Sequence, residues 1–496
     1  MYWHRALRHL NWRVIANLLG YVLLAAGCLM ILPLIVSLIY KEDVWQSFLW
    51  SIIICFAVSI PLMRVSTKMS SYFAKDGLIA VGLSWLLVSL FGALPFYCSG
   101  EIPSYIDALF ETVSGFTTTG SSILTDVEAL SYGLLFWRSF THWIGGMGVL
   151  VFVLALLPKS NERTMHIMRA EVPGPTIGKL VPRLKKSAMI LYMLYMLLTV
   201  IEIVLLLLGK MPLFDALVNT FGTAGTGGFA IKNLSIGAYD NAYYEGIITI
   251  FMLLFGVNFN LYYFLMIRDY RQAFKDEEMH VYFGIVAAAI ACIMINIYPI
   301  YESIADCLRY SSFQVASIIT TTGYSSVDFN LWPTLSKTIL LLLMVVGASA
   351  GSTGGGVKVS RMLIIVKKVK LDIQRLIHPQ KVNAITLNGR VVQEETVNQI
   401  MSFFCCYILI MASCFLIVSL DNFDIETTLT SVFACLSNIG PGLGLCGPMG
   451  NFAMFSDLSK LILTAAMLIG RLEIYPIIIF LSPLFHLPKL RKGQRE

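Results

Sequence analysis

Long apolar runs recur from one end of this chain to the other and constrain its fold more than any other feature. Hydrophobic residues make up 57% of the 496 residues and charged residues only 13%, so the chain carries more apolar surface than one soluble domain could bury. A helix needs roughly 20 apolar residues to cross the hydrocarbon layer. The runs predict an all-α polytopic membrane protein with ten spans, at residues 14–39, 46–63, 77–98, 134–157, 187–209, 245–267, 281–300, 335–366, 397–420 and 457–483.

The basic residues predict how these spans are oriented, because Lys and Arg near short loops resist translocation. Placing both termini in the cytoplasm puts most of the 36 Lys and Arg on the inner side, so this orientation is expected. The net charge of +6 is then a topology signal, and no nucleic-acid partner is indicated. The ten cysteines show no spacing typical of zinc or redox sites and are expected to be small buried hydrophobic residues.

Between alternate pairs of spans lies a short, half-polar segment that is repeated four times. The first begins at Asp107-Ala108-Leu109 and ends at Gly120; the second begins at Asp215-Ala216-Leu217 and ends at Gly228, thirteen residues after its Asp in both cases. Two further copies run from about Tyr301 and from Ile425. The final tetrads are Thr117, Thr118, Thr119 and Gly120; Gly225, Thr226, Gly227 and Gly228; Thr320, Thr321, Thr322 and Gly323; and Ser437, Asn438, Ile439 and Gly440.

These repeats predict four tandem helix–pore loop–helix units around a pseudo-fourfold axis. The expected divisions are residues 1–70 for two additional helices, then units at 71–160, 185–275, 280–370 and 395–496. A short helix that enters from outside and stops at mid-membrane directs its partly negative carbonyl end at the bilayer centre, which favours a cation. The irregular backbone after it must line a wet path, since unpaired carbonyls facing lipid are costly. Ordinary turns between spans are the alternative interpretation, and four spaced copies disfavour it.

Glycine at the fourth place of each copy permits positive φ and close approach of four segments about an axis. Asp107, Asp215 and Glu426 stand near the outer starts of the short helices, where acidic groups match the helix dipole. A cation-attracting mouth is expected as a consequence.

The sequence resembles the Trk, Ktr and HKT superfamily of potassium transporters, and most closely the bacterial Trk membrane subunit. Besides the four tetrads, the resemblance rests on residues 142–148 (HWIGGMG), 256–259 (GVNF), 351–358 (GSTGGGVK) and 470–473 (GRLE). The two additional N-terminal spans are of the Trk type. The resemblance implies potassium uptake across the bacterial inner membrane through a pore within one protomer, channel-like or coupled to a proton or sodium gradient as a symporter.

By this resemblance the tetrads form a selectivity filter. Potassium would be held, as a metal-binding site for the transported ion, by main-chain carbonyls of Thr118, Thr119, Thr226, Gly227, Thr321, Thr322, Asn438 and Ile439. Gly at all four filter positions resembles the potassium-selective members. Gly222 and Gly225 depart from the family pattern, which often has Ser there, and are expected to loosen this quarter of the filter.

The run from Gly347 to Gly356 places glycines and small polar residues inside an apolar span, and broken helices mark functional cavities. It predicts a flexible gating loop beneath the filter. A nucleotide-binding P-loop is disfavoured, because Lys358 does not directly follow Gly356 and no Ser or Thr follows that Lys. The predicted gate residues are Gly351, Ser352, Thr353, Gly354, Gly355, Gly356, Lys358 and Arg471.

Arg471 is a charge inside an apolar span, where charges are costly and usually functional. Pairing with Glu473 or Glu426 and a positive barrier at the gate are both open. Lys358 and Arg361 are expected either as anchors at the cytoplasmic edge or as gating residues. His142 is expected to be an interfacial or packing residue at the outer start of its span, and no catalytic constellation is visible.

The basic loops at 159–186 and 367–395 are expected to be solvated. The resemblance implies a homodimer surrounded by lipid and a cytosolic nucleotide-binding regulatory subunit of the TrkA kind, so no organic cofactor is expected on this chain. A secondary transporter of another solute is the alternative, and it would call for inverted repeats and a midplane pocket. A membrane enzyme would need a cluster of His, Asp or Cys at one depth.

Replacing Gly120 with Ser tests the filter assignment. The substitution is expected to weaken potassium preference, because Ser at this position accompanies sodium preference in plant relatives. Rubidium uptake into proteoliposomes with competing sodium measures the change. An unaltered ranking of ions would argue against Gly120 as a filter residue.

Overall fold

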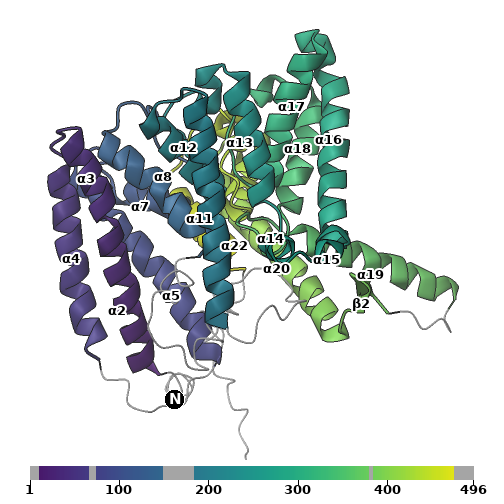
Figure 1. Ribbon diagram of the computed structural model, residues 1–496, viewed down its shortest axis with the longest axis horizontal. Coiled ribbons are helices and arrows are strands. Elements are labelled where there is room, and N and C mark those ends of the chain that lie inside the picture. Colours follow the sequence, from purple (N-terminus) through teal and green to yellow (C-terminus); the bar gives the residue numbers. More distant parts are fainter. Residues whose placement is uncertain (1–10, 66–73, 149–183, 379–383, 474–496) are drawn as a thin grey trace, which may run out of the picture.

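The computed structural model describes residues 11–65, 74–148, 184–378 and 384–473, and most of them are helical (Figure 1). The α-helices are α2 (Trp12–Leu29), α3 (Ile31–Ile39), α4 (Trp45–Met63), α5 (Ala74–Gly92), α6 (Leu94–Cys98), α7 (Tyr105–Phe116), α8 (Tyr132–Gly146), α11 (Leu184–Leu208), α12 (Leu213–Gly225), α13 (Ala242–Phe255), α14 (Phe259–Met266), α15 (Tyr270–Phe274), α16 (Glu277–Tyr301), α17 (Ile304–Ile319), α18 (Thr334–Val346), α19 (Val359–Ile377), α20 (Glu394–Val418), α21 (Ile425–Leu436) and α22 (Asp457–Arg471). Two short strands, β1 (Thr386–Leu387) and β2 (Arg390–Val391), pair antiparallel.

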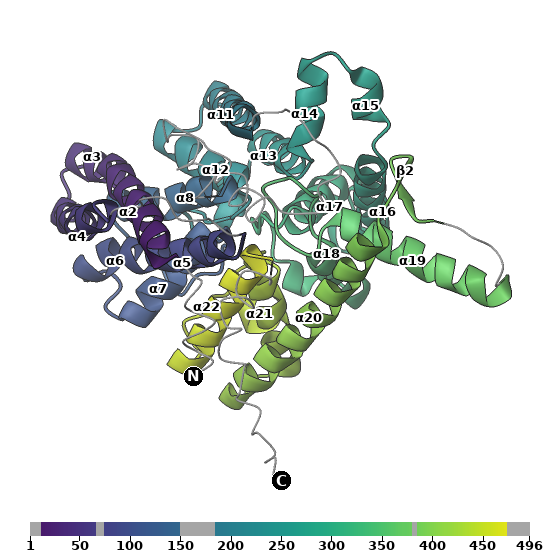
Figure 2. The ribbon, with the colours of Figure 1, turned by 90° about the horizontal axis from the view of Figure 1, so that it is seen from below.

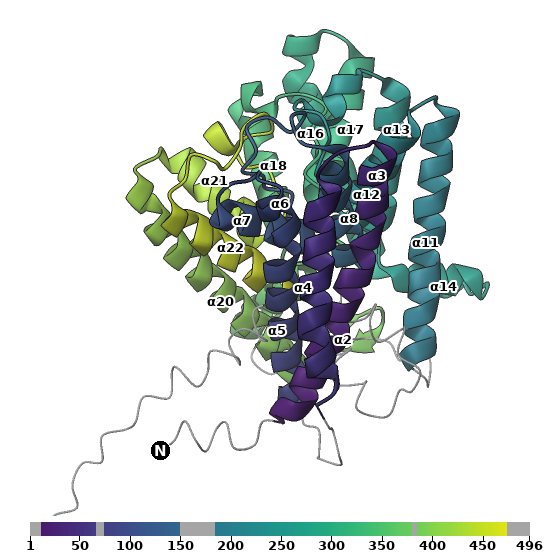
Figure 3. The ribbon, with the colours of Figure 1, turned by 90° about the vertical axis from the view of Figure 1, so that its left-hand side faces the viewer.

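The N-terminal helices stand upright beside one another, with α2 in contact with both α4 and α5 (Figure 3). Pro33 has no N–H to donate to the preceding turn, and the helical run from Trp12 to Ile39 is divided at Met30 into α2 and α3. Gly20 and Gly27 let α2 approach α4 closely, since a Cβ on either would meet atoms of α4 at less than 3.0 Å.

Four short helices, α7, α12, α17 and α21, contain 12 to 16 residues each and are too short to cross a bilayer. Three begin at a side-chain cap: Ser104, Ser303 and Asp424 each accept a hydrogen bond from a backbone N–H of the first turn. We call these four the pore helices, and each is followed by one of the repeated tetrads.

The pore helices and the helices that follow them form a closed cycle, seen along the bundle in Figure 2. Helix α8 of the first unit contacts pore helix α12 of the second, α13 contacts α17, α18 contacts α21, and α22 returns to α7. The cycle brings residues near both ends of the chain side by side around one axis.

The span predictions hold for some helices and fail for others. Six helices are long and apolar enough to cross a membrane, at Trp12–Ile39, Trp45–Met63, Ile79–Cys98, Met189–Leu208, Glu277–Tyr301 and Glu394–Asp421, within the described part of the chain. The span expected at 245–267 is wrong as a single helix, because α13 and α14 meet at an angle of 89°. The ends of the spans expected at 134–157 and 457–483 lie outside the described residues.

The predicted span at 335–366 is broken as the glycine-rich run indicated: α18 ends at Val346 and α19 begins only at Val359. Helix α19 continues to Ile377 and projects away from the bundle (Figure 1). Residues 347–358 between them form a non-helical segment that we call the gate loop.

Candidate functional site

The four tetrads share one backbone conformation. In every tetrad the second residue and the final Gly have positive φ, and the second residue is Thr118, Thr226, Thr321 or Asn438, with φ between 54° and 59°. A left-handed non-glycine residue costs roughly 1 to 2 kcal/mol, so four of them at equivalent positions are a shared feature under strain. The sequence predicted positive φ only for the glycines, because Thr and Asn carry little signal for this conformation.

The tetrads meet one another in a ring. A Cβ built on Gly120 would lie under 3.0 Å from the carbonyl oxygen of Gly227, and the same holds for Gly228 against Thr322, Gly323 against Ile439 and Gly440 against Thr119. Each final glycine therefore contacts the third carbonyl of the next unit, and the fourth unit returns to the first. A side chain at any of these four positions would require the facing main chain to shift.

Side chains behind the tetrads hold them in place. The hydroxyls of Thr117 and Thr119 lie 2.8 Å apart, and Thr320 and Thr322 repeat this contact at 2.8 Å in the third unit. Asn438 donates from Nδ2 to Thr119 Oγ1 at 2.9 Å and to the Met467 carbonyl at 2.9 Å. The fourth tetrad is thus tied both to the first tetrad and to α22.

His142 braces the second tetrad. It lies near the inner end of α8, fully buried, so its expected place at the outer start of a span is wrong, although its packing role is what the structure has. Nδ1 donates to the Gly115 carbonyl at 2.7 Å, and Nε2 accepts from the Phe229 N–H at 3.2 Å. The imidazole therefore joins the end of α7 to the segment after Gly228.

Gly222 and Gly225 are closely surrounded, whereas the expectation that they loosen this quarter of the filter stays a prediction. A Cβ on Gly225 would collide with the main chain of His142, and one on Gly222 would collide with the hydroxyl of Tyr324. The volume that Ser would occupy is already filled by these neighbours.

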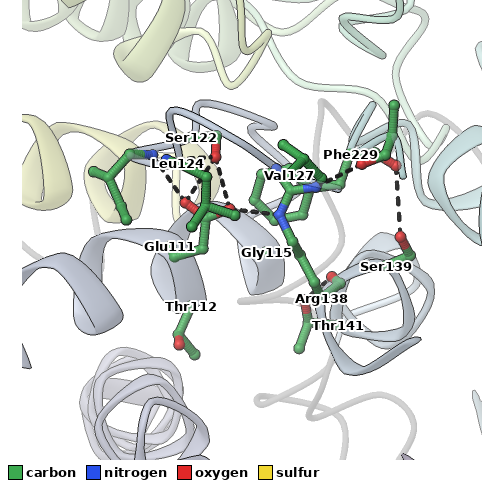
Figure 4. Close-up of polar contacts among 12 residues, drawn as sticks. Glu111, Thr112, Gly115, Ser122, Leu124, Val127, Arg138, Ser139, Thr141 and Phe229 are labelled. Atoms are coloured by element: carbon green, nitrogen blue, oxygen red, sulfur yellow. Dashed lines mark hydrogen bonds and ion pairs between the residues drawn. The ribbon is translucent and has the colours of Figure 1, made fainter. Parts of the chain in front are cut away.

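A buried ion pair lies at the outer side of the first two tetrads (Figure 4). Arg138 Nε donates to Glu111 Oε1 at 2.5 Å, and the two side chains are 3% and 0% exposed. Glu111 also accepts from the Ser122 hydroxyl and the Ile123 N–H, both just after the first tetrad. Arg138 donates to the Ala230 carbonyl at 2.8 Å and stacks over Phe229, just after the second tetrad. One ion pair therefore joins the outer ends of two tetrads.

Three of the four contacts between neighbouring units carry an ion pair near the outer surface. Each joins the helix after one tetrad to the next pore helix: Glu245 with Arg309, Lys337 with Glu426, and Lys460 with Asp107. The contact between α8 and α12 has the aromatic pair Tyr132 and Phe214 instead, with ring centroids 4.9 Å apart.

These ion pairs argue against the expectation that acidic residues form a cation-attracting mouth. Asp107 and Glu426 are neutralised by Lys460 and Lys337, and Asp215 accepts a hydrogen bond from the Tyr239 hydroxyl at 2.8 Å. Glu128, in the exposed loop after the first tetrad, is paired with Lys232, whose hydrogen bond lowers the pKa of its carboxyl. These acidic groups therefore mainly stabilise contacts between units and contribute less to a negative electrostatic potential at the mouth.

The gate loop lies directly beneath the tetrads. Gly356 N–H donates to the Ser437 carbonyl at 3.0 Å, and Gly355 N–H donates to Thr321 Oγ1 at 2.6 Å. On its other side the loop meets the bend between α13 and α14, where Ser349 N–H donates to the Gly256 carbonyl and Phe259 N–H to the Gly351 carbonyl. The loop is thus bound to two tetrads and to the second unit.

Two basic side chains, one buried and one partly buried, are bound to the gate loop. Lys358 is 2% exposed and donates from Nζ to the Gly354 carbonyl, which excludes an anchor position at the membrane edge. Arg471 donates to the carbonyls of Thr353, at 2.9 Å, and of Gly145 and Gly146, at 2.5 and 3.1 Å. The carboxylates proposed for Arg471 have other basic partners: Glu473 is bound to Arg361 and Glu426 to Lys337.

Glu278 holds the gate loop through the N-terminal end of α16, and sequence reasoning missed it. It is 5% exposed at the start of α16, and its Oε1 accepts from Ala350 N–H at 2.6 Å and from Ser360 N–H at 3.1 Å. One oxygen therefore binds both the loop and the first turn of α19. Its position directly after the exposed Glu277 gave no sign of this role.

Comparisons with known proteins give matches over nearly the whole chain. A family model described as a cation transport protein, TrkH, matches residues 44–490. The chain is 34% identical over 486 residues to the Trk system potassium uptake protein TrkH of Salmonella typhimurium, covering 96% of this chain and 99% of that protein. It is 33% identical over 478 residues to TrkG of Escherichia coli, covering 95% and 98%. The crystal structure of the potassium transporter TrkH from Vibrio parahaemolyticus matches with a TM-score of 0.85 at 30% identity, covering 96% and 100%.

Replacing Glu111 with Gln is expected to destabilise the protein, because Arg138 then remains buried without a carboxylate. Breaking one side of a buried pair costs about 3 to 5 kcal/mol. Thermal unfolding of the purified protein in detergent measures the effect. The matched control is Glu128→Gln, which breaks the exposed Lys232 pair between the same two units and should cost about 1 kcal/mol or less. Equal losses in the two variants would contradict a special role for the buried pair.

Proposed function

Because this chain belongs to the TrkH family of cation transport proteins and takes up potassium, we propose that the ions pass through one protomer along the axis shared by the four tetrads. The observation that carries the proposal is the closed cycle in which each final glycine contacts the third carbonyl of the next unit. Four segments from one chain then surround a single path. A secondary transporter of another solute is not favoured, since the relatives are potassium uptake proteins.

In this proposal the main-chain carbonyls of the tetrads replace the water shell of potassium. The contributing residues are Thr118, Thr119, Thr226, Gly227, Thr321, Thr322, Asn438 and Ile439. The positive φ of the second and fourth residues supports this role, because it turns neighbouring carbonyls to the same side. The carbonyl ends of the four pore helices add partial negative charge at mid-membrane.

The gate loop would close this path from below. Its hydrogen bonds to Ser437 and Thr321 support a closed position, because the loop must release the tetrads before ions can leave them. Arg471 would add a positive charge beside the closed loop, where it joins Thr353 to the end of α8. Opening then requires that the loop and Arg471 exchange these carbonyls for water.

The family and the charge pattern support an expectation for the location, orientation and partners of the protein. We expect a multi-pass protein of the bacterial inner membrane with cytoplasmic termini, acting as a homodimer with a TrkA-like nucleotide-binding subunit. The basic cytoplasmic loops support this orientation. Channel-like passage and symport both remain compatible with the proposed pore.

Replacing Glu278 with Ala is expected to raise potassium flux in the absence of any regulatory partner. The change frees the N–H groups of Ala350 and Ser360, and a lost bond of about 1.4 kcal/mol shifts a closed-to-open ratio about tenfold. Rubidium flux into proteoliposomes measures it. Glu278→Gln keeps an acceptor oxygen and should retain most of the regulation.

Glu277→Gln is the matched control, because Glu277 lies next in sequence but is bound to Lys367 near the surface. Removing residues 351–356 is the stronger test, and it should raise flux further. If flux stays low in both stably inserted variants, the loop is not the gate.

A further inference from the structure

Helix α11 has a narrow buried face that contains one carboxylic acid. Tyr195, Thr199, Glu202 and Leu206 are 0 to 3% exposed, whereas Met193, Leu197, Val204 and Leu208 on other faces are exposed to the surroundings of the bundle. The spacing of the buried residues is that of one helix face. Glu202 is 0% exposed, so its carboxyl lies inside the protein at membrane depth.

The carboxyl of Glu202 lacks the partners that other buried glutamates have. Glu111 is bound to Arg138, Glu245 to Arg309, and Glu278 to two backbone N–H groups. In the part of the chain that the structure describes, neither oxygen of Glu202 completes a hydrogen bond of ordinary geometry. On the same face of α11, Tyr195 packs in a cluster with Ala224 of α12, and Leu206 packs in a cluster with Ala216 of α12, so Glu202 lies against α12 between them.

Among the described residues, the helices that pack most closely against α11 supply no positive charge either. These are α12, α13 and α14, and their titratable residues are Asp215, Tyr243, Tyr244, Glu245, Tyr262 and Tyr263. Arg138 and Arg471, which act on Tyr324 and Tyr195, are bound to Glu111 and to main-chain carbonyls. An ionised carboxylate in this position would be a buried charge without compensation, which costs far more than carrying a proton.

We propose that Glu202 is an intramembrane proton-binding site, occupied by a proton when the transporter is at rest, and that its loss strengthens cation binding in the filter. The neutral acid donates its proton toward the hydroxyl of Thr223 in the last turn of pore helix α12. The proposed step is only the binding or release of a proton, so no other reactant is needed.

Thr223 connects this site to two tetrads. It lies three residues before Thr226 and donates to the Asn219 carbonyl at 3.0 Å. The Tyr324 phenol, directly after Gly323, donates to the same carbonyl at 2.8 Å. Thr223 and Tyr324 therefore share one acceptor behind the second and third tetrads, on the helix that Glu202 faces. Ionisation of Glu202 would place a negative charge behind the carbonyl end of α12, where it attracts a cation in the filter.

Binding of the proton and of potassium is then linked, and each weakens the other by the same factor. In wild-type protein the KM for rubidium uptake is expected to fall about fivefold or more as pH rises from neutral to alkaline, the lower end of ordinary coupling. Glu202→Gln, a permanently neutral mimic, should keep the neutral-pH KM and lose this dependence. The control is Glu395→Gln, an exposed residue of α20, which should behave as wild type.

Infrared spectra of protein labelled with ¹³C at the Glu carboxyls test the bound proton independently of transport. The band of a protonated carboxylic acid should be present in wild type and in Glu395→Gln, and reduced in Glu202→Gln. Thr223→Val should keep the band but shift its frequency, since the hydroxyl partner is lost. An unchanged band in Glu202→Gln, or the same pH dependence of KM as in wild type, would overturn the proposal.

Discussion

The whole structure depends on the hydrogen-bonding demand of main-chain groups inside a membrane. A carbonyl that faces lipid without a donor costs several kcal/mol, yet fifteen of the sixteen tetrad residues and the gate loop are non-helical at this depth. The tetrads meet the demand by facing one another in a closed cycle, with each final glycine against the third carbonyl of the next unit. Lining a path for a cation gives those carbonyls a partner that lipid cannot supply. The same constraint explains why the residues behind the tetrads are so often Thr, Ser, Asn or His.

The four units of the cycle share one backbone arrangement but differ in the side chains that join them. In three of the four contacts between neighbouring units, an ion pair joins the helix after one tetrad to the next pore helix. The first and second units meet instead through aromatic rings, the exposed pair of Glu128 and Lys232, and the bond from Arg138 to the Ala230 carbonyl. Only the second unit contains Gly222 and Gly225, and there His142 and Tyr324 occupy the available volume. Differences in packing behind equivalent backbones allow the quarters of one pore to differ in stiffness. They also place the Glu202 site at the second unit.

Buried polar side chains divide into those with complete sets of partners and those without. The buried Arg138 and Glu278 and the partly buried Arg471 each bind two or more groups and hold separate segments together. Such fully bonded groups stiffen a structure, because losing any partner exposes an unsatisfied charge. Glu202 differs by having no compensating charge, and a bound proton removes that cost. The presence or absence of bonding partners therefore distinguishes the charged residues that hold segments together from Glu202, the proposed proton-binding residue.

The sequence by itself determined the helical membrane architecture, the four repeated segments with their final glycines, and the break in the span after Val346. These features follow from local rules: apolar length sets a span, and a dense run of glycines and small polar residues favours a break in a helix. Only the tertiary structure decided which groups meet across units. It placed His142 at the inner end of α8 and bent the span at 245–267. It also paired Asp107 with Lys460 across the chain and buried Lys358. The type of a residue limits which bonds it can make, whereas the partner it bonds depends on how helices that are distant in sequence close into a ring.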